Sequence, residues 1–451
     1  MRVLHVSPTD IEGGAAKGAH NLHMALRHAG VDSLMLVQRK YGDDASVLTA
    51  GNRDSVMYEG LRDRLDRLPL RFYNWKRQSW WTVGWLPFDL SRAIGLLKPD
   101  VVHFHWSGRG AAPIKMMSRL RDYAVVWTLR DIWPLTGGCH YTVGCEKLYT
   151  GCGACPQLDS KHSFDISRWQ WRRKYRAWKN ADISFVAMSN WMAECARRSP
   201  LTFDNDVTVI PNGVDTRRFA PLDKQVARSL WGLPEDRRII MYGAINSTTD
   251  PRKGYDYLCR ALRMLAGRGW GERVCVVVFG AVSGEGIDGL DVRYVGRLSD
   301  AVSLATLYSC GDVMVVPSTE ENFAKTPIEA MACGVPVTAF ANTGQLDIVD
   351  HKINGYLARN LSAEDLACGI EWCLETGAAD ASLGRRARAK AVEFFDIRTI
   401  ARRYIAHYQL LLEVRRPAAA RAGEPPRPAV AKRAPVGLDE AAATARSINL
   451  L

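Results

Sequence analysis

The sequence lacks long hydrophobic runs and the usual form of an export signal. No apolar stretch approaches the ~18–20 residues that a membrane-spanning helix requires, so no such helix is expected. Residues 1–6 lead directly into a strand pattern, which leaves no room for a signal peptide. Both absences favour a cytoplasmic protein.

Two site patterns are also missing. The pair Gly13-Gly14 follows the first expected strand but is not G-x-G-x-x-G, and no clear acidic residue ends the next strand. Dinucleotide-binding sites depend on both features. No Asp-x-Asp carboxylate pair stands at the end of an expected strand. We therefore expect no required cofactor and no catalytic metal.

What is present is a large, moderately basic chain. Its 451 residues are too many for one hydrophobic core, so two domains are the default expectation. With 47% apolar and 24% charged residues, the composition is that of a soluble globular protein. The net charge of +12 suits phosphate-bearing substrates, anionic lipid or nucleic acid, and charge alone does not choose among them.

Strand and helix patterns alternate through both halves of the chain. The first half has a helical pattern at about 16–29 and expected strands at 2–6, 34–37, 99–106, 124–129, 183–188 and 207–210. The second half has helical patterns such as 254–266 and expected strands at 238–242, 274–279, 292–295, 313–317 and 336–339. This alternation predicts an α/β fold with two doubly wound parallel sheets.

Four segments follow from this pattern. We expect a Rossmann-like N-terminal domain at 1–205, a second Rossmann-like domain at 206–394, a helix at 395–414 that crosses back to the first domain, and a tail at 415–451. The tail is rich in Pro, Ala, Arg and Gly, a composition that favours disorder.

The most informative segment contains Glu321 and Glu329. The run 313–317 predicts a buried strand, and Thr326-Pro327-Ile328-Glu329 predicts a helix start with Thr326 as N-cap. Glu321 would sit at the carboxyl end of a strand and Glu329 in the first helical turn. Ligands of parallel sheets bind at that edge, and a helix N-terminus suits a phosphate. A structural interpretation competes, because Thr-x-x-Glu is also a capping box and Glu321 could be an ordinary loop carboxylate.

The Glu-x7-Glu spacing and the following Glu-Ala-Met-Ala-Cys-Gly-Val-Pro-Val resemble the donor-site signature of the retaining glycosyltransferases of family 4, and among them the bacterial polysaccharide type. The resemblance implies the GT-B fold, in which two Rossmann-like doubly wound domains face an interdomain cleft. It implies that Glu321 contacts the transferred sugar as a catalytic group and that Glu329 holds the ribose hydroxyls. The residues between them would also line the donor site: Asn322, Phe323, Ala324, Lys325 and Thr326.

Lys253 is the candidate cation for the departing diphosphate. It lies between an expected strand and a helix, and it resembles the family Lys in that catalytic role. The family also has an Arg close behind the preceding Gly, but here Gly243 is followed by Ala-Ile-Asn. Arg252 could replace the missing Arg in the donor site, as could a weaker bond from Asn246. Lys17 could be an ordinary solvated helix residue.

The first domain would complete the site. Gly13 and Gly14 resemble the family loop that borders the donor phosphates and the acceptor. His103 and His105 alternate on a strand, and we expect them to point to opposite faces, so that one is buried and the other reaches the cleft. His105 resembles the catalytic-site His that contacts the donor sugar, although a lone strand His is often structural. Arg130 stands where the family usually has His, which could suit an anionic donor or acceptor.

Four of the eleven cysteines form a cluster in the sequence, and the other seven are scattered through apolar segments as expected buried thiols. The cluster consists of Cys139, Cys145, Cys152 and Cys155. In a cytosolic chain it favours metal binding or reduced thiols over disulfides, and four thiolates could hold a structural zinc. The spacing is irregular and has no second Cys-x2-Cys pair, so plain thiols are the alternative.

Two basic stretches rich in aromatic residues, 61–81 and 168–179, lie in the first domain. Trp and Tyr suit a membrane interface, and Lys and Arg suit anionic headgroups. They would allow docking on the inner face of the cytoplasmic membrane, where a lipid-linked acceptor would lie. The alternative is an amphipathic helix that packs its aromatic side chains on the sheet.

These features together predict a glycosyltransferase that moves a sugar from a UDP- or GDP-sugar to a hydroxyl acceptor in polysaccharide or lipid-linked oligosaccharide biosynthesis. The resemblance implies that the transfer is retaining. The expected partners are this nucleotide-sugar donor, a glycan or lipid-linked acceptor and an anionic membrane, with no nucleic acid. Two alternatives stay open. One is a sugar-nucleotide epimerase or hydrolase on the same fold, and the other is a catalytically silent subunit that binds nucleotide-sugar.

Overall fold

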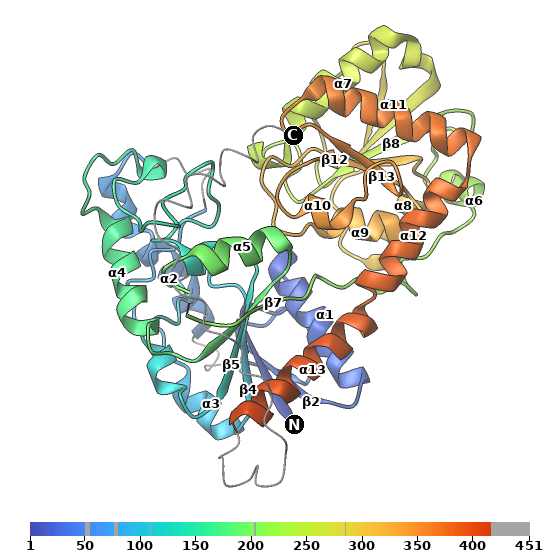
Figure 1. The fold of residues 1–451 in the computed structure, drawn as a ribbon. Coiled ribbons are helices and arrows are strands. Elements are labelled where there is room, and N and C mark those ends of the chain that lie inside the picture. The colour runs from blue at the N-terminus through green and yellow to red at the C-terminus, as the bar shows by residue number, and fades with distance from the viewer. Residues whose placement is uncertain (50–54, 76–79, 109, 203, 285, 416–451) are drawn as a thin grey trace. The chain divides into compact units, whose positions relative to one another are not determined.

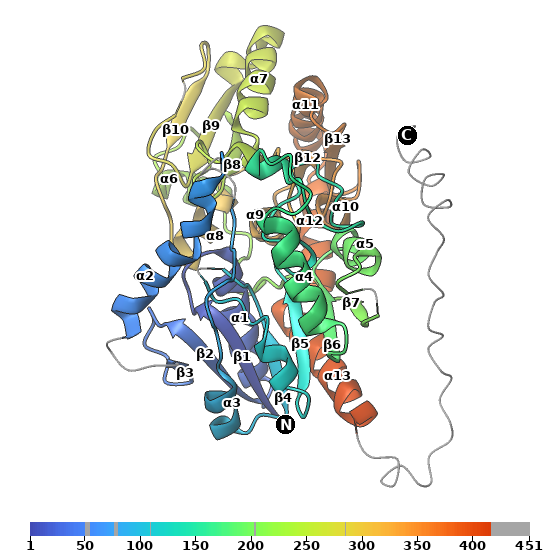
Figure 2. The same cartoon turned by 90° about the vertical axis from the view of Figure 1, so that its left-hand side faces the viewer.

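The computed structural model describes residues 1–49, 55–75, 80–108, 110–202, 204–284 and 286–415. Residues 1–412 form one compact unit that contains two parallel sheets, as Figure 1 and Figure 2 show. Helices cover both faces of each sheet, which confirms the doubly wound α/β expectation. All of the expected strands are present.

The N-terminal sheet has seven strands in the order β3-β2-β1-β4-β5-β6-β7. They are β1 (Arg2–Thr9), β2 (Asp32–Arg39), β3 (Val47–Thr49), β4 (Val101–Phe104), β5 (Ala124–Leu129), β6 (Ile183–Ala187) and β7 (Val207–Val209). The helices of this half are α1 (Gly14–His28), α2 (Ser55–Asp66), α3 (Ser91–Leu97), α4 (Ile166–Trp178) and α5 (Asn190–Arg198). The central strands β1, β4 and β5 are buried at nearly every position because helices cover both faces of this parallel sheet.

The C-terminal sheet has six strands in the order β10-β9-β8-β11-β12-β13. They are β8 (Arg238–Gly243), β9 (Val274–Phe279), β10 (Asp291–Tyr294), β11 (Val313–Val316), β12 (Val337–Phe340) and β13 (Gly355–Ala358). Its helices are α6 (Lys224–Leu230), α7 (Tyr255–Leu265), α8 (Ala301–Ser309), α9 (Lys325–Ala332), α10 (Gln345–Ile348), α11 (Ala363–Ala379) and α12 (Ser382–Phe395). One face packs against α7 and α11, and the other packs against α8, α9 and α12.

The last helix, α13 (Ile397–Arg415), returns to the N-terminal sheet. Ile400 and Tyr404 lie in the same buried cluster as Leu22 and Leu26 of α1. Tyr404 shares a hydrogen bond of 3.0 Å with the hydroxyl of Thr128 on β5. The chain therefore enters the C-terminal half once and comes back to the first sheet at its end.

Several elements and boundaries differ from the sequence expectations. The short edge strands β3 and β13 are not predicted, because runs of three and four residues give little periodic signal. The expected domain boundary at 205/206 is too early, since β7 adds residues 207–209 to the N-terminal sheet. The expected helix at 395–414 begins at Ile397, after extended backbone at Asp396 separates it from α12. Residues 416–451, most of the expected tail, lie outside the described part of the chain.

Candidate active site

Glu321 and Glu329 both lie at the carboxyl edge of the C-terminal sheet. Glu321 follows β11, and Glu329 is in α9, which begins at Lys325 with Ala324 as its N-cap. The prediction that Thr326 caps this helix is therefore wrong, because the helix starts earlier, and no side chain caps its N-terminus. The capping-box interpretation of Glu329 fails for the same reason. The first N–H groups of α9 stay available to an anion.

The side chains of Lys253 and Glu321 form an ion pair. Lys253 Nζ lies 2.5 Å from Glu321 Oε2, and the two side chains are 20% and 14% exposed. Lys253 ends the 3-10 turn Pro251–Lys253, and the next residue, Gly254, has φ +69°. A Cβ on Gly254 would lie 1.8 Å from the carbonyl oxygen of Pro317, so only glycine lets this turn pack against the end of β11. This close approach holds Lys253 beside Glu321.

Arg252 is held beside Lys253 by two contacts. Its guanidinium forms an ion pair of 2.5 Å with Asp250 and lies 3.5 Å above the ring of Tyr141, a residue of the N-terminal half. Its Nε and Nη1 atoms are buried without a hydrogen-bond partner among the described residues. The expectation that Arg252 replaces the missing family Arg stays a prediction, since both atoms are buried beside Tyr141.

Glu329 is buried and oriented by two neighbours. The hydroxyl of Tyr308 donates to Glu329 Oε2 at 3.2 Å, and Lys325 Nζ lies 3.5 Å from Oε1. Burial, together with the Glu329 carboxylate, holds the pKa of Tyr308 well above its usual value, so this hydroxyl keeps its proton. The carboxylate is therefore fixed in place on the second turn of α9. The expectation that Glu329 lies in the first turn is wrong, because the helix begins at Lys325.

Lys17, a residue of the N-terminal half, contacts the C-terminal half near this site. It lies on α1, yet its Nζ donates to the carbonyl of Ser299 at 3.2 Å in the C-terminal half. Burial lowers the pKa of Lys17, and Lys325 lowers it further while Glu329 opposes the shift. The interpretation of Lys17 as an ordinary solvated residue is wrong. Gly13 and Gly14 begin α1, and a Cβ on either would meet no atom within 4 Å, so space is open in front of both.

Asn322 and Phe323 do not present their side chains as expected. Asn322 Nδ2 donates to the carbonyl of Leu129 at 2.8 Å, and its Oδ1 accepts from Ser189 Oγ at 3.0 Å. Phe323 is buried and packs edge-on against Phe395. Both side chains join parts of the fold, so their predicted role as donor-binding side chains is corrected to a positioning role.

Sequence reasoning missed Glu320. Its carboxylate accepts three hydrogen bonds from the N-terminal half: from Thr142 N at 2.7 Å, Thr142 Oγ1 at 2.9 Å and Val143 N at 2.8 Å. Glu320 is 8% exposed, so these bonds compensate a buried charge. Its partners lie 178 residues earlier in the chain, and no local pattern points to them.

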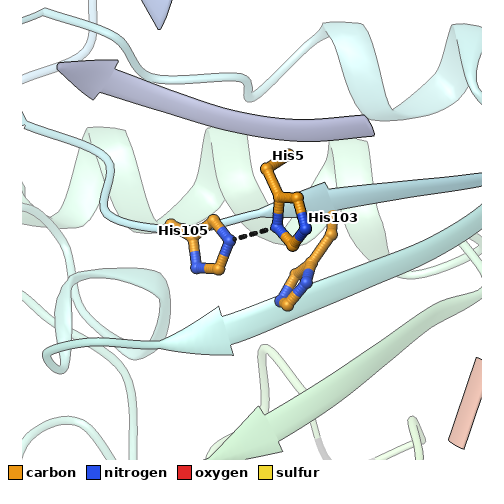
Figure 3. Close-up of side chains that lie close together, drawn as sticks. All are labelled: His5, His103 and His105. Atoms are coloured by element: carbon orange, nitrogen blue, oxygen red, sulfur yellow. Dashed lines mark hydrogen bonds between the residues drawn. The ribbon is translucent and has the colours of Figure 1, made fainter. Parts of the chain in front are cut away.

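His103 and His105 share a face of β4 and its extension, which corrects the expectation of opposite faces. Residues two apart in a strand point the same way. Both are buried, as is His5. Figure 3 shows the three rings close together, and His105 Nε2 lies 2.9 Å from His5 Nδ1. Burial holds the pKa of each ring well below its usual value, so all three are neutral.

The predicted donor contact of His105 is therefore replaced by a positioning contact. Arg130 Nη2 lies 3.3 Å from His105 Nδ1, and Arg130 Nη1 donates to Asn212 Oδ1. The three histidines could together hold a metal, since their ring nitrogens lie within 4.8 Å of one another. The adjacent guanidinium opposes a cation there, and both ring nitrogens of His103 already contact hydroxyl groups.

In the two basic aromatic stretches, some aromatic side chains are buried in the core and others are exposed. Trp81 and Trp178 are buried in the core, which supports the packing alternative for these residues. Phe72 is 87% exposed and Trp169 is 47% exposed. Residues 76–79 of the first stretch lie outside the described part of the chain. Within that part, no helix is long and apolar enough to cross a membrane.

Two family profiles match the chain. The profile described as Glycosyltransferase Family 4 matches residues 12–218, and Glycosyl transferases group 1 matches residues 236–376. Among solved structures, sucrose-phosphate synthase from Thermosynechococcus elongatus has a TM-score of 0.65 at 21% identity, covering 92% of this chain and 99% of that one. Anabaena HepE in complex with UDP-glucose has a TM-score of 0.59 at 17% identity, covering 91% and 100%. These likenesses establish the GT-B fold.

Curated relatives extend the match over nearly the whole chain. A D-inositol 3-phosphate glycosyltransferase of Mycolicibacterium smegmatis is 31% identical over 458 aligned positions, covering 93% of this chain and 94% of the relative. The enzyme of that name from Corynebacterium aurimucosum is 25% identical, covering 87% and 91%. The chain therefore belongs to the family 4 glycosyltransferases, enzymes with the GT-B fold.

Proposed function

We propose that the protein transfers a sugar from a nucleoside diphosphate sugar to a hydroxyl acceptor with retention of the anomeric configuration. The observation that carries this proposal is the Lys253–Glu321 pair beside the uncapped N-terminus of α9. Lys17 and Lys325 lie close to Glu329 at the same edge. This excess of cations and free N–H groups suits a diphosphate.

Different residues of the site would contact different parts of the donor. Glu329, oriented by Tyr308, would accept hydrogen bonds from the ribose hydroxyls. Lys253 would turn from Glu321 to the diphosphate oxygens, and the released Glu321 carboxylate would accept a hydrogen bond from a sugar hydroxyl. Arg252 would add a second cation through its unpartnered nitrogens. The two charges of the resting ion pair thus exchange partners when the donor binds.

The proposed reaction takes place on one face of the sugar. The bond between the anomeric carbon and the diphosphate oxygen breaks, and the acceptor oxygen forms the new bond to that carbon from the same side. The acceptor's proton passes to the leaving diphosphate, whose developing charge Lys253 stabilises. This route requires no metal to balance the charge.

Donor binding can be tested by thermal shift with UDP-, GDP- and ADP-sugars. A ligand at 100 times its Kd stabilises the folded state by about 2.7 kcal/mol. We expect a UDP-sugar to raise Tm, since the structurally similar HepE was solved with UDP-glucose. The shift should disappear in Glu329→Gln and persist in the control Glu235→Gln, an exposed carboxylate. A wild-type protein that no nucleotide-sugar stabilises would reject the proposed donor.

Two kinds of acceptor are candidates for the proposed transfer reaction. The curated relatives are named D-inositol 3-phosphate glycosyltransferases, which favours an inositol phosphate. The exposed Phe72 and Trp169 in the basic stretches favour a lipid-linked glycan precursor at an anionic membrane. Product mass spectrometry with each acceptor decides between them. Nucleotide release without transfer to either acceptor would instead favour the hydrolase alternative.

Membrane contact has its own test. We expect the protein to pellet with anionic phosphatidylserine vesicles at low salt and to stay in solution with neutral ones, because the proposed attraction is partly electrostatic. Trp169→Ala should weaken pelleting, since about half of Trp169 is exposed and Trp169 is not part of the buried core. Wild-type protein that stays in solution with both kinds of vesicle would remove the membrane from the proposed function.

A further inference from the structure

The four clustered cysteines surround one small cavity. Cys139, Cys145, Cys152 and Cys155 all line it, and its volume of about 20 Å³ is enough for one water-sized occupant. All four are free thiols in the structure. Cys152 Sγ accepts a hydrogen bond from Gly137 N at 3.1 Å, a contact that would also stabilise a thiolate.

A buried lysine, Lys174, lies beside this cavity. Lys174 on α4 is fully buried, and among the described residues it forms no ion pair. Its Nζ donates to the carbonyl of Thr136 at 2.9 Å and to that of Trp133, and it lies 3.3 Å above the Trp133 ring. Cys139, Cys152 and Asp131 all lie within electrostatic reach of this amine.

We propose that Cys139, Cys145, Cys152 and Cys155 bind one structural zinc ion. A zinc ion with four thiolates carries two net negative charges, which the neighbouring Lys174 and the cavity-lining Lys147 would balance. Each thiol releases its proton to solvent as its sulfur binds the metal.

The four sulfurs surround the cavity but are not yet gathered into a coordination sphere. Within the described part of the chain, the only group of three or more ligand atoms lying within 4.8 Å of one another is the histidine trio. Rotation of the short cysteine side chains would draw the sulfurs in to the ~2.3 Å Zn–S distance. The cysteines come from one loop rather than from fixed strands, so the backbone can also adjust.

The proposed metal would hold the loop that reaches the donor half. Between Cys139 and Cys145 this loop carries Tyr141, which stacks on Arg252, and Thr142, which donates to Glu320. Arg252 and Glu320 are the immediate neighbours of the Lys253–Glu321 pair. The zinc would therefore fix, from the N-terminal half, two contacts at the edge of the active site.

Metal content tests the proposal directly. Protein purified from zinc-supplemented medium should contain about one zinc per chain by mass spectrometry of the metal. Cobalt exchanged into the site should give the intense near-ultraviolet band of thiolate-to-cobalt charge transfer. Cys152→Ser should abolish the stoichiometric metal, whereas the matched control Cys373→Ser, a buried thiol in α11, should retain it.

Several outcomes would overturn the proposal. Wild-type protein with neither stoichiometric zinc nor a cobalt–thiolate band would do so, even if the variants fail to fold. Full metal retention in soluble Cys152→Ser, or a Cys152–Cys155 disulfide as the dominant state in mass spectrometry of the intact protein, would also contradict it. Because these measurements use no sugar donor, their results do not depend on whether the proposed transfer reaction is correct.

Discussion

Substitutions at the Lys253–Glu321 ion pair can separate the contribution of Lys253 to stability from its proposed role in the reaction. We consider Lys253→Met, Glu321→Gln and the double variant. The ammonium and carboxylate are 2.5 Å apart, and their side chains are 20% and 14% exposed. Removing one partner of a buried pair costs about 3–5 kcal/mol, and an exposed pair contributes about 0.2–1 kcal/mol. For this partly buried pair, we expect each single substitution to lower the free energy of unfolding by about 2 kcal/mol.

The double variant should recover most of that loss, because neither charge is then left without its partner. The coupling energy of the cycle should be about 1–2 kcal/mol, in the range of contacting residues. Activity should behave differently. Removing one preorganised group that stabilises transition-state charge costs about 10²–10³ in kcat, and the double variant still lacks the Lys253 cation. Stability should therefore return in the double variant while kcat stays low.

Denaturant unfolding measures the first quantity, and transfer of labelled sugar at saturating donor measures the second. Lys224→Met is a matched control, since Lys224 Nζ pairs with Asp312 at 2.8 Å but its side chain is 47% exposed. It should change both quantities little. If Lys253→Met keeps full kcat, or if the double variant regains kcat together with stability, Lys253 serves only as the partner of Glu321 and the proposed chemistry is refuted.

Three further predictions follow from single contacts. Glu320→Ala leaves the donors of Thr142 without a partner and should lower stability by about 1–3 kcal/mol while exposing the cysteine-rich loop to proteases; unchanged Tm and cleavage would contradict this. Burial lowers the pKa of His23 to about 4, so the contribution of His23 to stability should be full above pH 6.5. As the pH falls toward 4, the free energy of unfolding should decrease by up to about 1.4 kcal/mol per pH unit. Thermal unfolding at several pH values should show a smaller decrease in His23→Gln. In Gly18→Ala the new Cβ would lie 2.6 Å from Arg130 Nη1, so displacement of that side chain from His105 and Asn212 should lower Tm, and an unchanged Tm would contradict this.

The fold was largely predictable because covered parallel strands are continuous apolar runs. The expected strand 124–129 matches β5 at both ends, and 274–279 matches β9 in the same way. The start of α9 was not predictable from the residues, because Thr326-Pro327 gives a strong capping pattern that the tertiary structure overrides. Ala324 and Lys325, where the helix begins, have no comparable local signal.

The histidine error has a different cause. The period of a strand places His103 and His105 on one face, so the sequence already contained the answer for their direction. Their burial was not evident, because it depends on α13, which is some 300 residues away and covers that face with Tyr408. A polar strand end resembles a ligand-facing edge until the helix that covers it is known.

Glu320 and Glu321 are neighbours in the sequence but contact different halves of the fold. The two neighbours serve different halves, since Glu320 accepts bonds from Thr142 and Val143 while Glu321 pairs with Lys253. One peptide bond joins them, so a displacement of the N-terminal loop that carries Thr142 acts directly on the backbone that holds Glu321. The Glu321 carbonyl in turn accepts from Gly344 N at 3.0 Å, which limits how far that backbone can move. The position of the Glu321 carboxylate therefore depends on contacts from both halves, and the spacing of Glu321 and Glu329 alone cannot specify it.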